Sequence, residues 1–138
     1  MDYVRLIAQL RKHEGVEHKP YTDTVGKLTI GVGRNLDDRG LSDHEIDFLL
    51  QNDIQLVEEE LTEWWPHWRA LNQTRQLVVA DMMFNMGRPR LSQFKMFLAA
   101  LQASDYEAAS AEMLDSKWAG QVKGRATTLA DMMSTGDG

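Results

Sequence analysis

The stretch EGVEHKPYTDTVGKLTIGVGRNL, residues 14–36, decides how the rest of the chain is interpreted. It holds two carboxyl side chains, Glu14 and Asp23, separated by a turn-forming segment and followed by a strand of small residues. A glycosidic bond is cut most simply by a pair of carboxyl groups, one protonated to assist the leaving oxygen and one ionised. The stretch therefore offers such a pair.

The residues before this stretch predict an amphipathic helix. Apolar side chains recur at helical spacing between residues 3 and 10, Asp2 can cap the start, and Gly15 can end the helix. Glu14 is then placed at the C-terminal end, where the negative pole of the helix dipole disfavours a second negative charge. That position suits an acid catalyst.

The middle of the stretch predicts a β-hairpin that turns near Val25-Gly26. Apolar residues alternate with Thr29, Gly31 and Gly33, so we expect the apolar face to pack inward. Glycine in a strand often marks a place where a ligand or another backbone comes close, which would set Thr29 beside an open cleft floor. Glycines that only permit strand twist are an equally good interpretation.

Downstream, the pattern is helical. The capping box Ser42-Asp43-His44-Glu45 opens a long helix that reaches the low sixties. Three indoles then follow, at positions 64, 65 and 68, and we favour core packing over a sugar-stacking platform for them. An apolar run over 77–86 predicts a central buried helix closed by Gly87, and further helices are predicted at about 91–101, 104–114 and 124–133.

These elements predict an α+β fold that is predominantly α. We expect one catalytic domain over residues 1–138, because 138 residues with 43% hydrophobic content suit a single core. Its expected parts are a hairpin lobe (14–45), a connecting helix (42–63) and a helical lobe (1–13 plus 64–138). A cleft is expected between the two lobes.

Composition argues against several classes of function. A net charge of -6 disfavours a nucleic-acid binder, and the absence of cysteine removes thiolate metal sites. The four histidines lack zinc-site spacing, and we expect no cofactor. Charges at positions 2, 5, 11 and 12 leave no leader or membrane segment there, so we expect cytoplasmic synthesis and no stable membrane insertion.

Residues 14–36 resemble the catalytic stretch of the T-even type of phage lysozymes, glycoside hydrolase family 24. The family pattern falls in register on Glu14, Asp23, Thr29, Ile30, Gly31 and Gly33. A weaker likeness extends through Phe84-Asn85-Met86-Gly87, Ser116-Lys117-Trp118 and Arg125 followed by Thr135-Gly136. The likeness thus covers nearly the whole chain and implies a lysozyme-like fold.

The resemblance implies hydrolysis of the bond between N-acetylmuramic acid and N-acetylglucosamine in peptidoglycan. Glu14 would be the general acid, Asp23 the carboxylate that helps place water, and Thr29 a hydroxyl near that water. An inverting reaction is implied, which requires carboxyl groups about 6.5 to 9.5 Å apart.

Three further residues are candidates for substrate binding. Gly31 belongs to the glycine strand, and Arg125 matches an arginine that relatives place beside the catalytic glutamate. Asn85 matches a cleft-floor position whose amide would bind a sugar acetamido group, although a residue near the helix end at Gly87 is an alternative interpretation.

The sequence departs from the family pattern in two places. Many relatives have histidine where this chain has Arg34, and we expect Arg34 to form a salt bridge with Asp53 on the connecting helix, without the pH sensitivity of a histidine. The segment between Leu36 and Leu41 is shorter than in the T-even enzymes, which trims the small lobe.

Two other functions remain open. A lytic transglycosylase cuts the same bond with one acid and no water, and a non-catalytic peptidoglycan-binding helical module is possible because fold does not guarantee activity. We expect a monomeric phage endolysin, made in the host cytoplasm, that reaches the cell wall after a holin-type membrane protein breaches the membrane.

Overall fold

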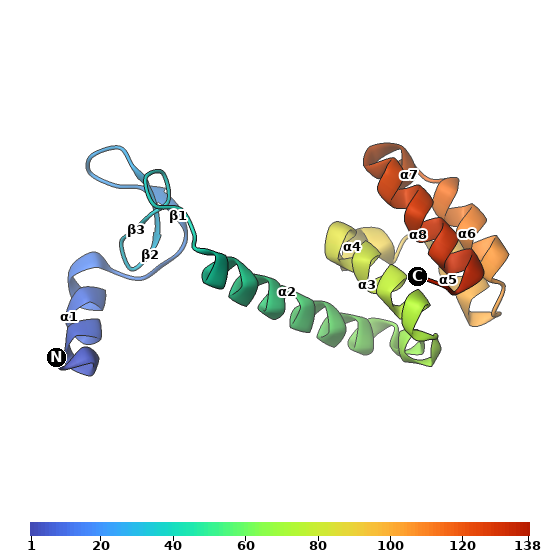
Figure 1. Ribbon diagram of the computed structural model, residues 1–138, viewed down its shortest axis with the longest axis horizontal. Helices are drawn as coiled ribbons and strands as arrows, with labels where there is room; N and C mark the ends of the chain where they lie inside the picture. The colour runs from blue at the N-terminus through green and yellow to red at the C-terminus, as the bar shows by residue number, and fades with distance from the viewer. The chain divides into compact units, whose positions relative to one another are not determined.

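The computed structural model describes all residues, 1–138, and the chain forms two compact units, Met1–Leu49 and Leu50–Gly138 (Figure 1). The first unit holds a helix and a small antiparallel sheet, and the second is entirely helical. This composition confirms the α+β, mostly helical, lysozyme-like fold class. The predicted assignment of residues 1–13 to the helical lobe, the single-domain organisation and the interlobe cleft stay predictions.

The first unit begins with α1 (Tyr3–Glu14), whose two ends are those predicted. The Asp2 side chain accepts a hydrogen bond from the Arg5 N–H, and Gly15 adopts φ 79° while its N–H donates to the Arg11 carbonyl. Glycine takes this positive φ without steric cost, so the helix ends directly after Glu14. The catalytic candidate is therefore the last residue of α1.

A three-stranded antiparallel sheet follows α1. Its strands are β1 (Glu17–Thr22), β2 (Leu28–Gly31) and β3 (Arg34–Asn35), in the order β1-β2-β3. The predicted hairpin is β1-β2, and its turn includes Val25 and Gly26. The third strand was not predicted, because two residues carry no alternation to detect.

The face of the sheet that is buried differs from the prediction. Thr29, on the central strand, is only 3% exposed, whereas Leu28 and Val32 are 40% and 38% exposed. The expectation that the apolar face packs inward is therefore wrong for Leu28 and Val32. Thr29 pairs with Tyr21 of β1 on one side and with Asn35 of β3 on the other.

Arg34 joins the sheet to the start of the long helix α2 (Asp43–Trp64). Its Nη1 lies 2.6 Å from Glu45 Oε2 and donates to the Gly40 carbonyl at 3.3 Å. The predicted partner, Asp53, is wrong. Glu45 is in the first turn of α2, next to the loop that follows the sheet, whereas Asp53 lies about two turns further along the helix.

The capping box at the start of α2 forms as predicted. The Ser42 N–H donates to Glu45 Oε1 at 3.0 Å, and the Glu45 N–H donates to Ser42 Oγ at 3.2 Å. These bonds pair two backbone donors that the first helical turn leaves without partners. Glu45 therefore caps the helix and binds Arg34 at the same time.

In the second unit, the buried residues of α3 (Gln73–Met86) belong to a single hydrophobic core. The remaining elements are η1 (Pro66–Ala70), α4 (Arg88–Leu91), α5 (Lys95–Gln102), α6 (Tyr106–Leu114), α7 (Lys117–Val122) and α8 (Gly124–Thr135). Trp65 and Trp68 are buried in this core, as favoured from the sequence. The core is rich in thioether side chains, which fill irregular gaps; the buried ones are Met82, Met83, Met86, Met113 and Met133.

The later helices differ in detail from the predicted ones. The segment predicted as one helix over 91–101 is divided between α4 and α5 by a turn at 92–94, and α7 was missed because it is short. The helix predicted from residue 104 begins at Tyr106, because the Asp105 side chain caps α6 by accepting the Ala108 N–H and Ser104 adopts φ 57°. None of the helices has the length and hydropathy needed to cross a membrane.

The Glu45→Gln substitution tests the link between sheet and helix. Hydrogen bonds from Ser42, and then the Arg34 guanidinium, lower the pKa of Glu45 from its ordinary 4.5 to about 2. The stabilisation is present above pH 4.5 and is lost as the pH falls toward 2, because the folded state then also binds the proton.

We expect the wild type to exceed the Glu45→Gln variant in free energy of unfolding at neutral pH, and this difference to shrink between pH 4.5 and about 2. Urea unfolding across that range measures it. A difference that stays constant with pH would contradict the assignment.

Candidate active site

Glu14 is exposed at the end of α1, and its carboxyl group lies against the turn between β2 and β3. A β-carbon built on Gly33 would stand 2.7 Å from Glu14 Oε2 and 3.0 Å from its carboxyl carbon. Only a glycine leaves this space open. The last turn of the helix also carries three basic side chains, Arg11, Lys12 and His13.

Asp23 organises the turn between β1 and β2. Its Oδ1 accepts the N–H groups of Val25 and Lys27, at 3.0 and 2.8 Å, and its own N–H donates to the Lys27 carbonyl at 2.8 Å. These bonds give Asp23 a structural role, because its carboxyl group forms the turn. They use Oδ1, and Oδ2 makes no hydrogen bond within the protein, so one carboxylate oxygen is left for another partner.

Thr29 is joined to Asp23 through a single carbonyl group. The Thr29 hydroxyl donates to the Lys27 carbonyl at 2.9 Å, and the same oxygen accepts the Asp23 N–H. Because the hydroxyl proton is engaged in this bond, Thr29 Oγ1 is left as an acceptor for any further partner. The turn therefore holds the Asp23 carboxylate and the Thr29 oxygen in a fixed relation.

Gly31 ends β2 and is paired with Glu17 of β1. It adopts φ 69°, which an alanine would adopt only with strain, and a β-carbon there would meet nothing within 4 Å. Open space beside this backbone fits the predicted approach of a ligand, and the positive φ alone also explains the glycine.

Two acids that the sequence did not point to, Asp37 and Asp38, bind residues at and just before the start of β2. Asp37 Oδ2 accepts the Leu28 N–H at 2.7 Å, and Asp38 Oδ1 pairs with Lys27 Nζ at 3.1 Å. The Asp38 hydrogen bond and charge raise the pKa of Lys27, and the Lys27 hydrogen bond lowers the pKa of Asp38. The adjacent aspartates just after a strand were the available signal, because such residues commonly form turns.

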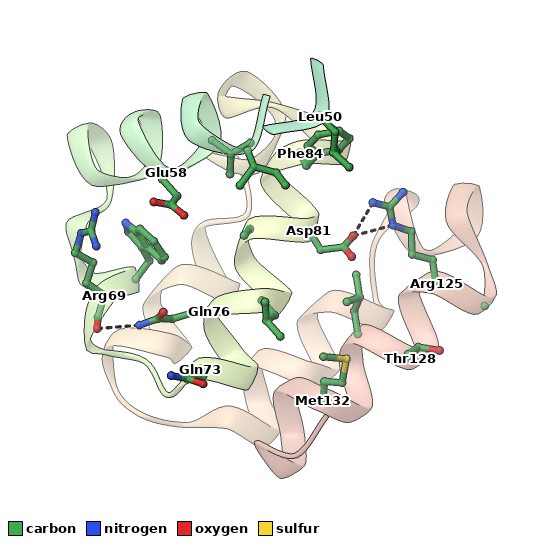
Figure 2. A pocket seen from close by; sticks show the side chains of 17 residues that line it. Leu50, Glu58, Arg69, Gln73, Gln76, Asp81, Phe84, Arg125, Thr128 and Met132 are labelled. Carbon is green, nitrogen blue, oxygen red and sulfur yellow. Dashed lines mark hydrogen bonds and ion pairs between the residues drawn. The ribbon is translucent and has the colours of Figure 1, made fainter. Parts of the chain in front are cut away.

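In the second unit, Arg125 of α8 is paired with Asp81 of α3. Its Nη2 and Nε lie 2.6 and 2.8 Å from Asp81 Oδ1, and Figure 2 shows the two side chains facing one another. Both side chains are more than a third exposed, so this ion pair contributes little to stability. The predicted role of Arg125 beside the catalytic glutamate stays a proposal.

Arg125 also lines an open groove of about 1000 Å³ formed by α2, η1, α3 and α8. Exposed apolar side chains dominate it, among them Leu50, Ile54, Leu77 and Phe84. Asn85, from the same unit, does not line it. Amide and hydroxyl side chains line it as well, from Gln73, Gln76 and Thr128.

Asn85, one residue before the end of α3, is exposed and has a structural partner. Its Oδ1 accepts the indole N–H of Trp118 at 2.7 Å, and Trp118 is only 1% exposed. The amide oxygen thus satisfies a buried donor, while the amide nitrogen remains available. Both interpretations of Asn85 are therefore compatible with its geometry. No cluster of three or more His, Cys, Asp or Glu side chains is placed to hold a metal ion.

Replacing Asn85 separates its two roles. Asn85→Ala leaves the buried Trp118 N–H without a partner, and we expect a loss of about 1 to 3 kcal/mol in unfolding free energy. Asn85→Asp keeps the acceptor and removes the donor, so we expect a smaller loss. Urea unfolding measures both, and equal losses would contradict the structural role of the Trp118 bond.

Comparison with known sequences agrees with the family resemblance. The chain is 28% identical to the pre-baseplate central spike protein Gp5 of Enterobacteria phage T4, over 93% of this chain and 27% of that protein. It is 25% and 24% identical to the probable T4-type lysozymes 2 and 1 of Dictyostelium discoideum, each over 92% of both proteins.

The sequence pattern of one family covers most of the chain. The phage lysozyme model matches residues 11–131, a range that includes all six candidate site residues. The chain therefore belongs to the phage lysozyme family of glycoside hydrolases.

Proposed function

We propose that this protein is a muramidase that hydrolyses the β-1,4 bond between N-acetylmuramic acid and N-acetylglucosamine in bacterial peptidoglycan. Membership of the phage lysozyme family supports the reaction class. The observation that carries the residue assignment is the shared Lys27 carbonyl, which joins the Asp23 turn to the Thr29 hydroxyl. The proposal is that this carboxylate and this hydroxyl oxygen together bind one water molecule.

In the proposed mechanism, Glu14 donates a proton to the leaving oxygen of the glycosidic bond. Asp23 Oδ2 and Thr29 Oγ1 both accept hydrogen bonds from the attacking water, since the Thr29 proton is already donated to Lys27. Asp23 removes the proton that the water donates to it as the water oxygen attacks C1 of the sugar, and the other water proton stays on the new hydroxyl group. Attack on the face opposite the leaving group gives inversion.

Three further contacts to the substrate are proposed. The Asn85 amide nitrogen would donate to a sugar acetamido carbonyl, because its oxygen already serves Trp118. The backbone at Gly31 would lie close to the saccharide, and its open surroundings support this. Arg125 would be the third contact to the substrate, as the family resemblance implies, and its present partner is Asp81.

The proposed setting is host lysis as a phage endolysin. A monomer made in the host cytoplasm would reach peptidoglycan once a holin-type membrane protein opens the membrane. Expression of the protein inside bacteria, with and without such a pore former, tests this setting. Lysis that does not depend on the pore would contradict it.

Replacement of Glu14 tests the proposed activity. Glu14→Gln removes the proton donor, and we expect clearing of permeabilised bacteria to slow on the order of 10²- to 10⁴-fold. The control is Glu107→Gln, the same change at an exposed acid of α6, which we expect to clear at the wild-type rate. The new chain ends from purified peptidoglycan are identified in parallel.

The products distinguish the alternatives. A reducing N-acetylmuramic acid end released with inverted anomeric form supports the proposal, and an anhydro end would establish a lytic transglycosylase. Undiminished clearing by Glu14→Gln would favour a different catalytic residue, and a wild type without any clearing would favour a binding module.

Asp23 has a structural and a proposed catalytic role, and two substitutions separate them. Asp23→Asn keeps an Oδ1 acceptor for the turn, so we expect near-normal stability with a loss of rate on the order of 10²- to 10⁴-fold. Asp23→Ala also removes two hydrogen bonds and should lose about 1 to 3 kcal/mol more in unfolding free energy. Thermal unfolding and clearing assays measure both; an active Asp23→Asn variant would exclude the catalytic role.

A further inference from the structure

Two glycines flank Val32 in the turn that joins β2 to β3, and they differ in their surroundings. Gly31 and Gly33 both adopt φ 69°, so backbone conformation alone favours glycine at each. A β-carbon at Gly31 would meet nothing within 4 Å. A β-carbon at Gly33 would collide with the end of the Glu14 side chain.

The approach of Glu14 to Gly33 involves the whole carboxyl end of the side chain. The built β-carbon of Gly33 stands 2.7 Å from Oε2, 3.0 Å from Cδ and 3.2 Å from Cγ of Glu14. Real β-carbons do not approach other heavy atoms within 3.0 Å, so one of the two groups would have to move. Glu14 is the group that yields, because it is exposed and flexible at its end.

The turn itself is held firmly. Ile30 and Arg34 are paired across it as neighbours of the β2-β3 ladder. Arg34, directly after Gly33, is bound to Glu45 at 2.6 Å and to the Gly40 carbonyl at 3.3 Å. The backbone of Gly33 is therefore held in place where the exposed Glu14 side chain contacts it.

We propose that Gly33 is a positioning residue for the Glu14 carboxyl group. Because Gly33 has no side chain, it leaves a space, which we call the seat, that the Glu14 carboxyl group occupies and that sets its rotamer. The claim about the seat concerns geometry alone, and its consequence for rate rests on the proposed function of Glu14. Proton transfer requires the donor within hydrogen-bond reach of the leaving oxygen, so a displaced carboxyl group lowers the rate without unfolding the protein.

The test compares Gly33→Ala with Gly40→Ala. Gly40 adopts a similar φ of 63°, and a β-carbon there meets only the Leu36 carbonyl, at an ordinary 3.8 Å. The two variants therefore carry similar backbone strain. Only in Gly33→Ala does the added β-carbon clash with the Glu14 side chain. Three quantities are measured for each: the urea midpoint, kcat and KM on solubilised peptidoglycan, and the carbon-13 chemical shift of the Glu14 carboxyl carbon.

For Gly33→Ala we expect a urea midpoint similar to that of Gly40→Ala, a carboxyl signal of Glu14 that moves, and kcat roughly 10²-fold lower at little changed KM. For Gly40→Ala we expect the carboxyl signal and kcat of the wild type. An unmoved Glu14 signal in Gly33→Ala would overturn the inference.

The same measurements separate this inference from the proposed function. A moved Glu14 signal with wild-type kcat would support the claim that Gly33 positions the carboxyl group. It would refute the claim that this position affects the rate. An active Glu14→Gln variant would defeat the proposed role of Glu14, while the chemical shift would still report whether Gly33 seats its carboxyl group. Equal losses of kcat in Gly33→Ala and Gly40→Ala would overturn the positioning role, because strain would then explain both.

Discussion

The first unit depends on one carbonyl oxygen, that of Lys27. It accepts the Asp23 N–H and the Thr29 hydroxyl, while the Lys27 N–H donates back to Asp23 Oδ1. A sheet this small has little apolar surface to bury, so hydrogen bonds within the turn must fix its shape. The same bonds orient the carboxylate and the hydroxyl that we propose hold the attacking water. Turn formation and the proposed catalysis thus both depend on the hydrogen bonds of Asp23 and Thr29.

The sequence predicted much of this architecture because the decisive signals are local. The Asp2 cap, the end of α1 at Gly15 and the Ser42-Glu45 box each depend on residues within one helical turn of one another. The family pattern added the order of the catalytic candidates, since their spacing along residues 14–36 is distinctive. The comparison over residues 11–131 confirms the family, and the roles of the individual residues remain proposals.

What the sequence did not predict depends on contacts across the turn or between helices. Arg34 was assigned to Asp53 by analogy with a histidine, yet it pairs with Glu45, which the capping box already holds nearby. The burial of Thr29 was missed because alternation marks Leu28 and Val32 as the apolar face, whereas the side chain that the structure covers is that of Thr29. The contact of Gly33 with Glu14 has no sequence signal, because glycine at a positive φ is sufficiently explained by the backbone.

The methionines of the second unit have a consequence for its chemistry under oxidising conditions. Met96 is 68% exposed, whereas Met82, Met113 and Met133 are sealed inside the helical core. Peroxide converts an accessible thioether to a polar sulfoxide, and it reaches a sealed one only when the surrounding helices open. The core thioethers are therefore internal reporters: their rate of sulfoxidation, compared with that of Met96, follows how often the helical unit exposes its interior.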